Sequence, residues 1–82
     1  MSPADTELIV YWRPGCGFCM RLERVLVAAS VEYERRNIWE DDSAASFVRS
    51  VNGGSEIVPT VVIDGEVLTN PDPDEVLERL GG

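Results

Sequence analysis

The sequence predicts an α/β domain whose elements follow the order β-α-β-α-β-β-α. Short runs of β-branched and aromatic residues alternate with segments in which apolar residues recur at helical spacing. The last two strands flank Asp64-Gly65, a dipeptide typical of tight hairpins. A parallel unit followed by a hairpin gives one four-stranded mixed sheet with helices on both faces. We expect a single domain over residues 1–82, with its core at about 7–80.

The first half of the chain is predicted to form a strand, a helix and a second strand. Leu8–Trp12 is rich in β-branched and aromatic residues and is short enough for a buried strand. Residues 31–38 alternate apolar and charged side chains, which indicates a second strand. Between them, residues 17–29 show helical periodicity, with Arg21, Glu23 and Arg24 on the outer face and an inner face of Leu22, Val25, Leu26 and Ala29.

The second half is predicted to form a helix, a hairpin and a last helix. Asp41 or Asp42 can cap a helix that runs to about Val51 and ends at Asn52-Gly53. Strands follow at residues 59–63 and 66–69. The inner face of the predicted helix consists of Ala44, Phe47, Val48 and Val51.

The last predicted helix has strong start and stop signals. Asp72 stands at the N-cap, Pro73 at the first position and Glu75 at the third, a pattern that predicts a capping box. The helix ends at Gly81, and its inner face is predicted to hold Val76, Leu77 and Leu80.

Charge and composition exclude several classes of partner. The net charge is −8, and the seven basic residues are all arginine, with no lysine or histidine. Nucleic acids and anionic membranes bind basic surfaces, so neither is expected as a partner. The first residues show no signal peptide, and no apolar run is long enough to span a membrane. Two cysteines three positions apart make no disulfide framework, so we expect a cytoplasmic location. We also expect the chain to act as a monomer.

The motif Cys16-Gly17-Phe18-Cys19 carries the chemistry, because it follows a strand and opens a helix. At a helix N-terminus, free N–H groups and the positive end of the dipole favour thiolate over thiol. Arg13 can add a cation. Thiolate is the attacking species in disulfide exchange, so Cys16 is the candidate nucleophile. Cys19 is expected beneath Cys16 and less exposed.

Other interpretations of the two cysteines remain open at this point. A zinc site needs four ligands, whereas the chain offers two cysteines and no histidine. A structural disulfide across so short a loop restrains little of the unfolded chain. An iron–sulfur cluster shared between two copies would need two small-molecule thiols to complete its ligands. A redox-inert adaptor is also possible. We expect no metal site and no bound cofactor.

The sequence also predicts the environment of one proline, three aromatic residues and one arginine. Pro59 is compatible with the start of a strand or with a cis Val58-Pro59 bond, which would turn the Val58 backbone toward Cys16. Phe18 is expected to be exposed and to contact substrate. The remaining residues are expected to pack at strand ends, as for Trp12 and Trp39, or to be solvated, as for Arg49.

The segment from Tyr11 to Leu22 resembles the active site of glutaredoxins, and Val58-Pro59-Thr60 resembles their cis-proline loop. Three further runs look like mycoredoxins, the actinobacterial relatives that use mycothiol instead of glutathione. These runs are Phe47-Val48-Arg49-Ser50-Val51-Asn52-Gly53-Gly54, Val58-Pro59-Thr60-Val61 and Leu68-Thr69-Asn70-Pro71. The resemblance covers nearly the whole chain and implies a thioredoxin/glutaredoxin-like fold with a cis Pro59.

The resemblance also implies a mechanism. Cys16 would attack the mycothiol sulfur of a mycothiolated protein, and a second mycothiol would then free it. Cys19 would be dispensable. Mycothiol is the implied co-substrate, with glutathione less favoured. The alternatives are a dithiol reductant of one enzyme, recharged by thioredoxin reductase, and an iron–sulfur carrier.

The sequence departs from the glutaredoxin pattern in two places. Gly17-Phe18 replaces the usual Pro-Tyr pair, and Thr69-Asn70-Pro71-Asp72 stands where glutaredoxins have two glycines. Thr69 and Asn70 would narrow the pocket and offer polar groups to a sugar-bearing thiol. The predicted catalytic residues are Cys16 and Cys19, and the predicted substrate-binding residues are Arg13, Gly17, Phe18, Val58, Pro59, Thr69, Asn70 and Asp72.

Overall fold

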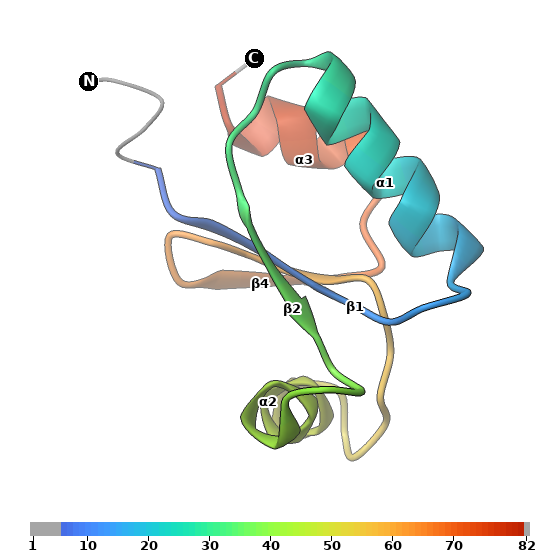
Figure 1. Ribbon diagram of the computed structural model, residues 1–82. Coiled ribbons are helices and arrows are strands. Elements are labelled where there is room, and N and C mark those ends of the chain that lie inside the picture. The colour runs from blue at the N-terminus through green and yellow to red at the C-terminus, as the bar shows by residue number, and fades with distance from the viewer. Residues whose placement is uncertain (1–5, 82) are drawn as a thin grey trace.

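Four strands form one mixed sheet in the order β2-β1-β3-β4 in the computed structural model, which describes residues 6–81 (Figure 1). The strands are β1 (Leu8–Trp12), β2 (Glu34–Asn37), β3 (Thr60–Ile63) and β4 (Glu66–Thr69). The helices are α1 (Gly17–Ala28), α2 (Asp42–Val51) and α3 (Pro73–Arg79). Only β2 runs parallel to its neighbour, so the predicted mixed sheet and element order are confirmed. The N-terminal stretch, where no signal peptide was predicted, lies outside the described residues for positions 1–5.

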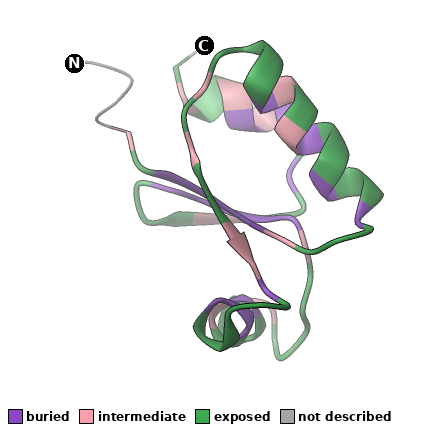
Figure 2. Ribbon diagram, viewed as in Figure 1, coloured by how far each residue is buried: buried purple, intermediate pink, exposed green. Residues whose placement is uncertain are grey.

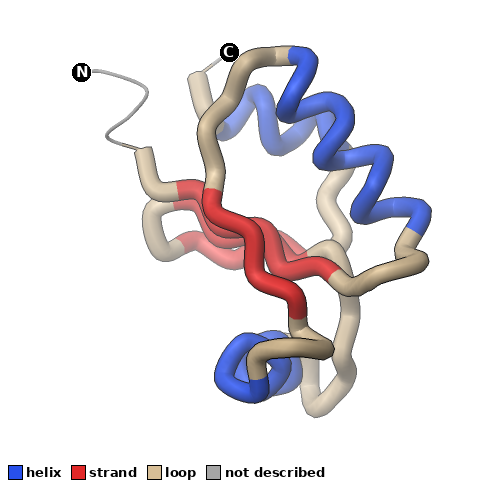
Figure 3. The backbone as a smooth tube through the Cα atoms, in the orientation of Figure 1, coloured by secondary structure: helices blue, strands red, loops and turns tan. Residues whose placement is uncertain are grey.

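The helices cover both faces of the sheet, with α1 and α3 on one side and α2 on the other (Figures 1 and 3). Side chains along β1 point alternately to the two faces of the sheet, so its residues belong to two separate apolar clusters. The cluster under α1 and α3 contains Leu8, Val10, Leu22, Leu26, Val61, Ile63 and Val76. The cluster over α2 contains Ile9, Tyr11, Ile38, Ala44, Ala45, Val48 and Val62. The central strands are therefore buried on both faces, whereas β2 is not (Figure 2).

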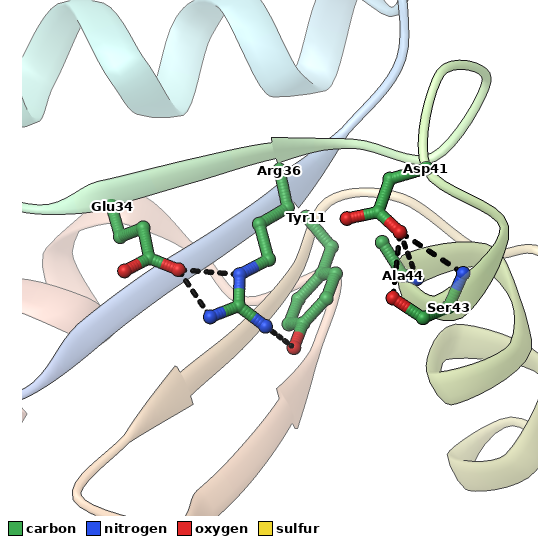
Figure 4. A network of polar contacts seen from close by, with 6 residues as sticks. All are labelled: Tyr11, Glu34, Arg36, Asp41, Ser43 and Ala44. Atoms are coloured by element: carbon green, nitrogen blue, oxygen red, sulfur yellow. Dashed lines mark hydrogen bonds and ion pairs between the residues drawn. The ribbon is translucent and has the colours of Figure 1, made fainter.

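Polar contacts fix the start of α2 and the edge strand beside it (Figure 4). Asp41, rather than Asp42, is the N-cap, and its carboxylate accepts from the Ser43 and Ala44 N–H groups at 3.0 and 3.2 Å. Hydrogen bonds from Ser43 and then Ala44 lower the pKa of Asp41. In the same view Arg36 pairs with Glu34 and donates to the Tyr11 hydroxyl at 3.5 Å.

Strand β2 is shorter than predicted, because it starts at Glu34 instead of residue 31. The ladder with β1 begins at the pair Ile9–Glu34. Tyr33 lies before that ladder, and its hydroxyl donates to Glu23 at 2.9 Å. The prediction that Glu23 faces outward was wrong, since its side chain is only 13% exposed. The alternation of apolar and charged residues correctly predicted that Val31 and Tyr33 pack against the core. It did not predict how many residues pair with β1.

Three further predictions need correction. The carboxylate of Asp72 makes no cap hydrogen bond, and its carbonyl instead accepts from the Glu75 and Val76 N–H groups, so the capping box was wrong. Trp39 was expected to pack, yet it is 60% exposed. Val51 was placed on the inner face of α2 but is exposed at its last turn.

Candidate active site

Cys16 is the N-cap of α1, as the motif predicts. The turn between β1 and α1 requires Gly15, whose φ of 79° lies in the left-handed region. Cys16 itself has an extended backbone, and its Sγ accepts a hydrogen bond from the Cys19 N–H at 3.2 Å. A helix N–H without an intrahelical partner thus points at the sulfur of Cys16.

The proline loop, which contains Val58 and Pro59, also contacts the Cys16 sulfur. The Val58-Pro59 bond is cis, as the resemblance implies, and the Cys16 thiol donates to the Val58 carbonyl oxygen at an Sγ–O distance of 3.7 Å. Within residues 6–81, the Val58 N–H donates to no acceptor. A backbone edge with an unused donor therefore lies beside the nucleophile, which suits an extended peptide substrate.

The two cysteines are both free thiols and differ in their surroundings. Cys16 is recessed, with 8% of its surface exposed, and Cys19 is fully buried, as the sequence predicted. Burial, and then its hydrogen bond with Cys16, raises the pKa of the Cys19 thiol to about 12. Cys19 consequently stays protonated at neutral pH, so Cys16 remains the candidate for the attacking sulfur.

A cleft of about 170 Å³ opens beside the first turns of α1. Phe18 is 63% exposed and forms one wall, as predicted for a substrate-contacting ring. The cleft brings together the predicted residues Phe18, Asn70 and Asp72 with Arg21, Pro71 and Pro73.

Arg21 is a cleft residue that the sequence analysis missed. It stands three positions after Phe18 and so shares its helix face, which was the available signal. Its guanidinium lies 4.0 Å from the Asp72 carboxylate across the cleft. The cleft thus offers a ring, a cation, a carboxylate and amide groups to a ligand.

Other predicted site residues lie at the margin of the site. The guanidinium of Arg13 lies over the Trp39 ring, 5.8 Å from its centroid. A Cβ atom at Gly17 would meet nothing within 4 Å, so no contact within the described chain requires glycine there. The Thr69 hydroxyl donates to Asn52 at 2.6 Å instead of pointing into the cleft unpaired. Substrate binding by these three residues stays a prediction, as it does for Phe18, Val58, Pro59, Asn70 and Asp72.

Residues 6–81 contain no group of three or more histidine, cysteine or acidic side chains placed to hold a metal ion. No helix in this described stretch combines the length and apolar character needed to cross a membrane.

Comparisons with known proteins agree with this geometry. Residues 8–68 match the family model for glutaredoxins. A protein assigned to the glutaredoxins in Mycobacterium tuberculosis is 46% identical over 74 residues, which cover 89% of this chain and 88% of the relative. Mycoredoxin 1 of Corynebacterium glutamicum is 34% identical over 76 residues, 92% of this chain and 94% of that protein.

Solved structures give the same result. A variant of a thioredoxin-like protein superposes with a TM-score of 0.77 at 32% identity, covering 93% of this chain and 100% of that one. The glutaredoxin-like NrdH-redoxin of Escherichia coli shares the fold, with a TM-score of 0.76, 21% identity and coverage of 88% and 92%. The thioredoxin-like fold is therefore established, and the chain belongs to the glutaredoxin family, as an oxidoreductase of the glutaredoxin type with actinobacterial relatives.

Proposed function

We propose that this protein reduces mixed disulfides between proteins and mycothiol by a monothiol mechanism, with Cys16 as the only essential cysteine. The observation that carries the proposal is the sulfur of Cys16 between the Cys19 N–H and the Val58 carbonyl, above a Cys19 thiol whose pKa is raised to about 12. The 34% identity to Mycoredoxin 1 supports mycothiol as the thiol.

The reaction is two successive thiol–disulfide exchanges. First, the Cys16 thiolate attacks the mycothiol sulfur of the mixed disulfide, the bond between mycothiol and the target breaks, and the target leaves as a thiolate that takes a proton from water. Then the thiolate of a second mycothiol attacks the mycothiol sulfur held on Cys16. Mycothiol disulfide departs, and Cys16 is again a thiolate. The target gains two electrons, and two mycothiols become one disulfide.

The character of the cleft at the first turns of α1 supports a polar, sugar-bearing thiol as the ligand. Arg21, Asn70 and Asp72 supply charged and amide groups at its wall, and Phe18 supplies a ring on which a sugar can lie. The Asn70 side chain at the wall of the cleft would restrict the approach of a peptide thiol such as glutathione. The partners proposed are mycothiol and mycothiolated proteins, bound by a monomer without a resident cofactor.

The cytoplasm is the proposed location, because thiols there are kept reduced and can drive the reaction. Because the sequence contains no histidine, no imidazole of this chain protonates the leaving thiolate, and water is the proton donor proposed here rather than Cys19 or another acid.

Turnover of a mycothiolated model protein tests the proposal. Wild type and Cys19→Ser are expected to reduce it at similar rates, within about threefold, and Cys16→Ser is expected to lose at least about a thousandfold, since nothing replaces the nucleophile. Equal amounts of mycothiol and glutathione are compared as the second thiol. Faster turnover with glutathione overturns the mycothiol assignment.

Turnover of the Cys19→Ser variant and anaerobic purification separate the alternatives. A dithiol reductant would lose its activity in Cys19→Ser and accept electrons from thioredoxin reductase. An iron–sulfur carrier would purify under anaerobic conditions as a brown dimer. Either result contradicts the monothiol proposal.

A further inference from the structure

Asn52, at the C-cap of α2, has hydrogen bonds that reach two segments beside Cys16. Its Nδ2 donates to the Val48 carbonyl at 2.8 Å and to the Thr60 Oγ1 at 3.2 Å. Its Oδ1 accepts from the Thr69 hydroxyl at 2.6 Å. One amide side chain therefore joins the end of α2, the start of β3 and the end of β4.

Thr60 links Asn52 to the loop that precedes Pro59. It is a buried polar residue with no exposed surface, and its hydroxyl donates to the Ile57 carbonyl at 2.7 Å. A hydroxyl has a single proton to donate. When Asn52 donates to the Thr60 oxygen, that proton is committed to the Ile57 carbonyl.

The Ile57 carbonyl in turn orients the Val58 N–H, because the two groups belong to one planar peptide. The cis bond in this loop follows Val58, so the Ile57–Val58 peptide is trans, and its C=O and N–H point in opposite directions. A carbonyl held toward the buried Thr60 directs the Val58 N–H away from the interior. That N–H is the donor without an acceptor in residues 6–81, and the Val58 carbonyl is the group 3.7 Å from Cys16.

The second arm of the network reaches the rim of the cleft. Thr69, bound to Asn52, is followed by Asn70, whose φ of 47° is left-handed. The Asn70 N–H donates to the Pro59 carbonyl at 2.8 Å. The cleft residue Asn70 and the Val58-Pro59 edge are thus tied to each other and, through Thr60 and Thr69, to Asn52.

We propose that Asn52 is a positioning residue that acts through Thr60 to aim the Val58 N–H at the backbone of an extended peptide bound beside Cys16. Asn52 itself contacts no substrate. The inference goes beyond the proposed function, in which Cys16 attacks the mycothiol sulfur. It requires that Cys16 also exchange disulfides at the cysteine of a bound peptide, and it is independent of which small thiol the protein uses.

Two disulfide probes test this proposal. One is an extended peptide whose single cysteine carries thionitrobenzoate. The other is dithiobis(nitrobenzoate), which has no peptide backbone to pair with Val58. In both, the Cys16 thiolate displaces thionitrobenzoate, and its initial release by the reduced protein is followed by absorbance. The ratio of the two rates isolates the contribution of the Val58 edge.

Asn52→Ala is expected to lower the peptide rate about tenfold, the effect of losing about one hydrogen bond, with the small-disulfide rate unchanged. Asn52→Asp, which cannot donate to Thr60, is expected to behave alike. Thr60→Val should reproduce the loss, and Thr60→Ser, which keeps the hydroxyl, should restore the wild-type ratio.

Ser50→Ala is the matched control, because it removes the 2.6 Å hydrogen bond to the Phe47 carbonyl on the same helix without touching the loop. It is expected to leave both rates unchanged. The proposal is overturned if Asn52→Ala lowers both rates equally or neither. Wild type that releases thionitrobenzoate from the small disulfide but not from the peptide overturns peptide exchange itself, and with it the inference.

Discussion

Cys16 and Cys19 are one helical turn apart, and the difference between them arises from what each sulfur contacts. The sulfur of Cys16 meets a helix N–H and the edge of the proline loop. Cys19 lies in the interior with no exposed surface, where burial disfavours the charged form. The Cys-x-x-Cys spacing therefore places one sulfur at the helix N-terminus beside the proline loop and holds the other thiol in its neutral form.

Alkylation should report this difference. At pH 8 about one Cys19 thiol in ten thousand is ionised when its pKa is about 12. Iodoacetamide is therefore expected to modify Cys16 and leave Cys19 free in the folded protein, as mapped by peptide mass. Unfolding in urea should make both cysteines reactive, which serves as the control. Equal labelling of both cysteines in the folded state contradicts the burial argument.

The N-cap position of Cys16 could be predicted from sequence because its setting is local. A cysteine placed between a strand and a helix is an N-cap wherever the rest of the chain goes. The roles of Arg21 and Asn52 could not be predicted in this way. Asn52 was interpreted only as a helix end, because its partners Thr60 and Thr69 come from other strands.

At the scale of elements, side-chain contacts join the edge strand β2 to its neighbours in addition to its ladder with β1. It is an edge strand of sequence Glu-Arg-Arg-Asn, and none of its residues is buried. Its connection to α1 is Glu23, which accepts from Tyr33 at 2.9 Å and pairs with Arg35. Arg35 also lies 4.2 Å from the centroid of the Trp12 ring.

Glu23→Gln is therefore expected to destabilise the fold by about 1–2 kcal/mol, since it weakens a charged acceptor shared by Tyr33 and Arg35. Glu34→Gln is the matched control, because Glu34 pairs with Arg36 while its side chain is 54% exposed, and a change of about 0–0.5 kcal/mol is expected. Urea unfolding of both variants measures the difference. Equal losses would show that the contact between α1 and β2 is no stronger than a surface ion pair.

Element order could be predicted because each helix and central strand has its own periodicity. The ends of the elements could not, as Asp72 shows. Its position fits a capping box, but its carboxylate lies 4.0 Å from Arg21 of α1 and makes no cap hydrogen bond. Competition between a local cap and a partner on another helix is decided by tertiary structure, which a sequence pattern does not contain.

At the scale of the whole molecule, a chain of 82 residues divides its apolar interior between two thin clusters, one on each face of the sheet. Such a small domain buries only roughly 60–65% of the surface of its unfolded chain, so its stability margin is narrow. Ionisation of groups that are neutral in the folded state then measurably lowers the free energy of unfolding of the whole protein.

The Cys19 thiol and the Tyr33 phenol are two such groups, and we expect them to lower the stability of the fold at alkaline pH. Burial is the first cause that raises the pKa of Cys19 from 9.0 to about 12 and that of Tyr33 from 10.0 to about 12. Between pH 9 and 12 the unfolded chain therefore binds fewer protons than the folded one, and raising the pH favours unfolding. The free energy of unfolding, measured in urea, is expected to be level from pH 7 to 8.5 and to fall steadily above pH 9.

Cys19→Ser and Tyr33→Phe each remove one titrating group and should flatten the profile, and the double variant should flatten it most. Each comparison is made on the slope against pH, so that the cost of the substitution itself, which lowers the whole curve, does not enter. A double variant with the wild-type slope would place the alkaline loss in other groups and contradict the assignment to the Cys19 thiol and the Tyr33 phenol.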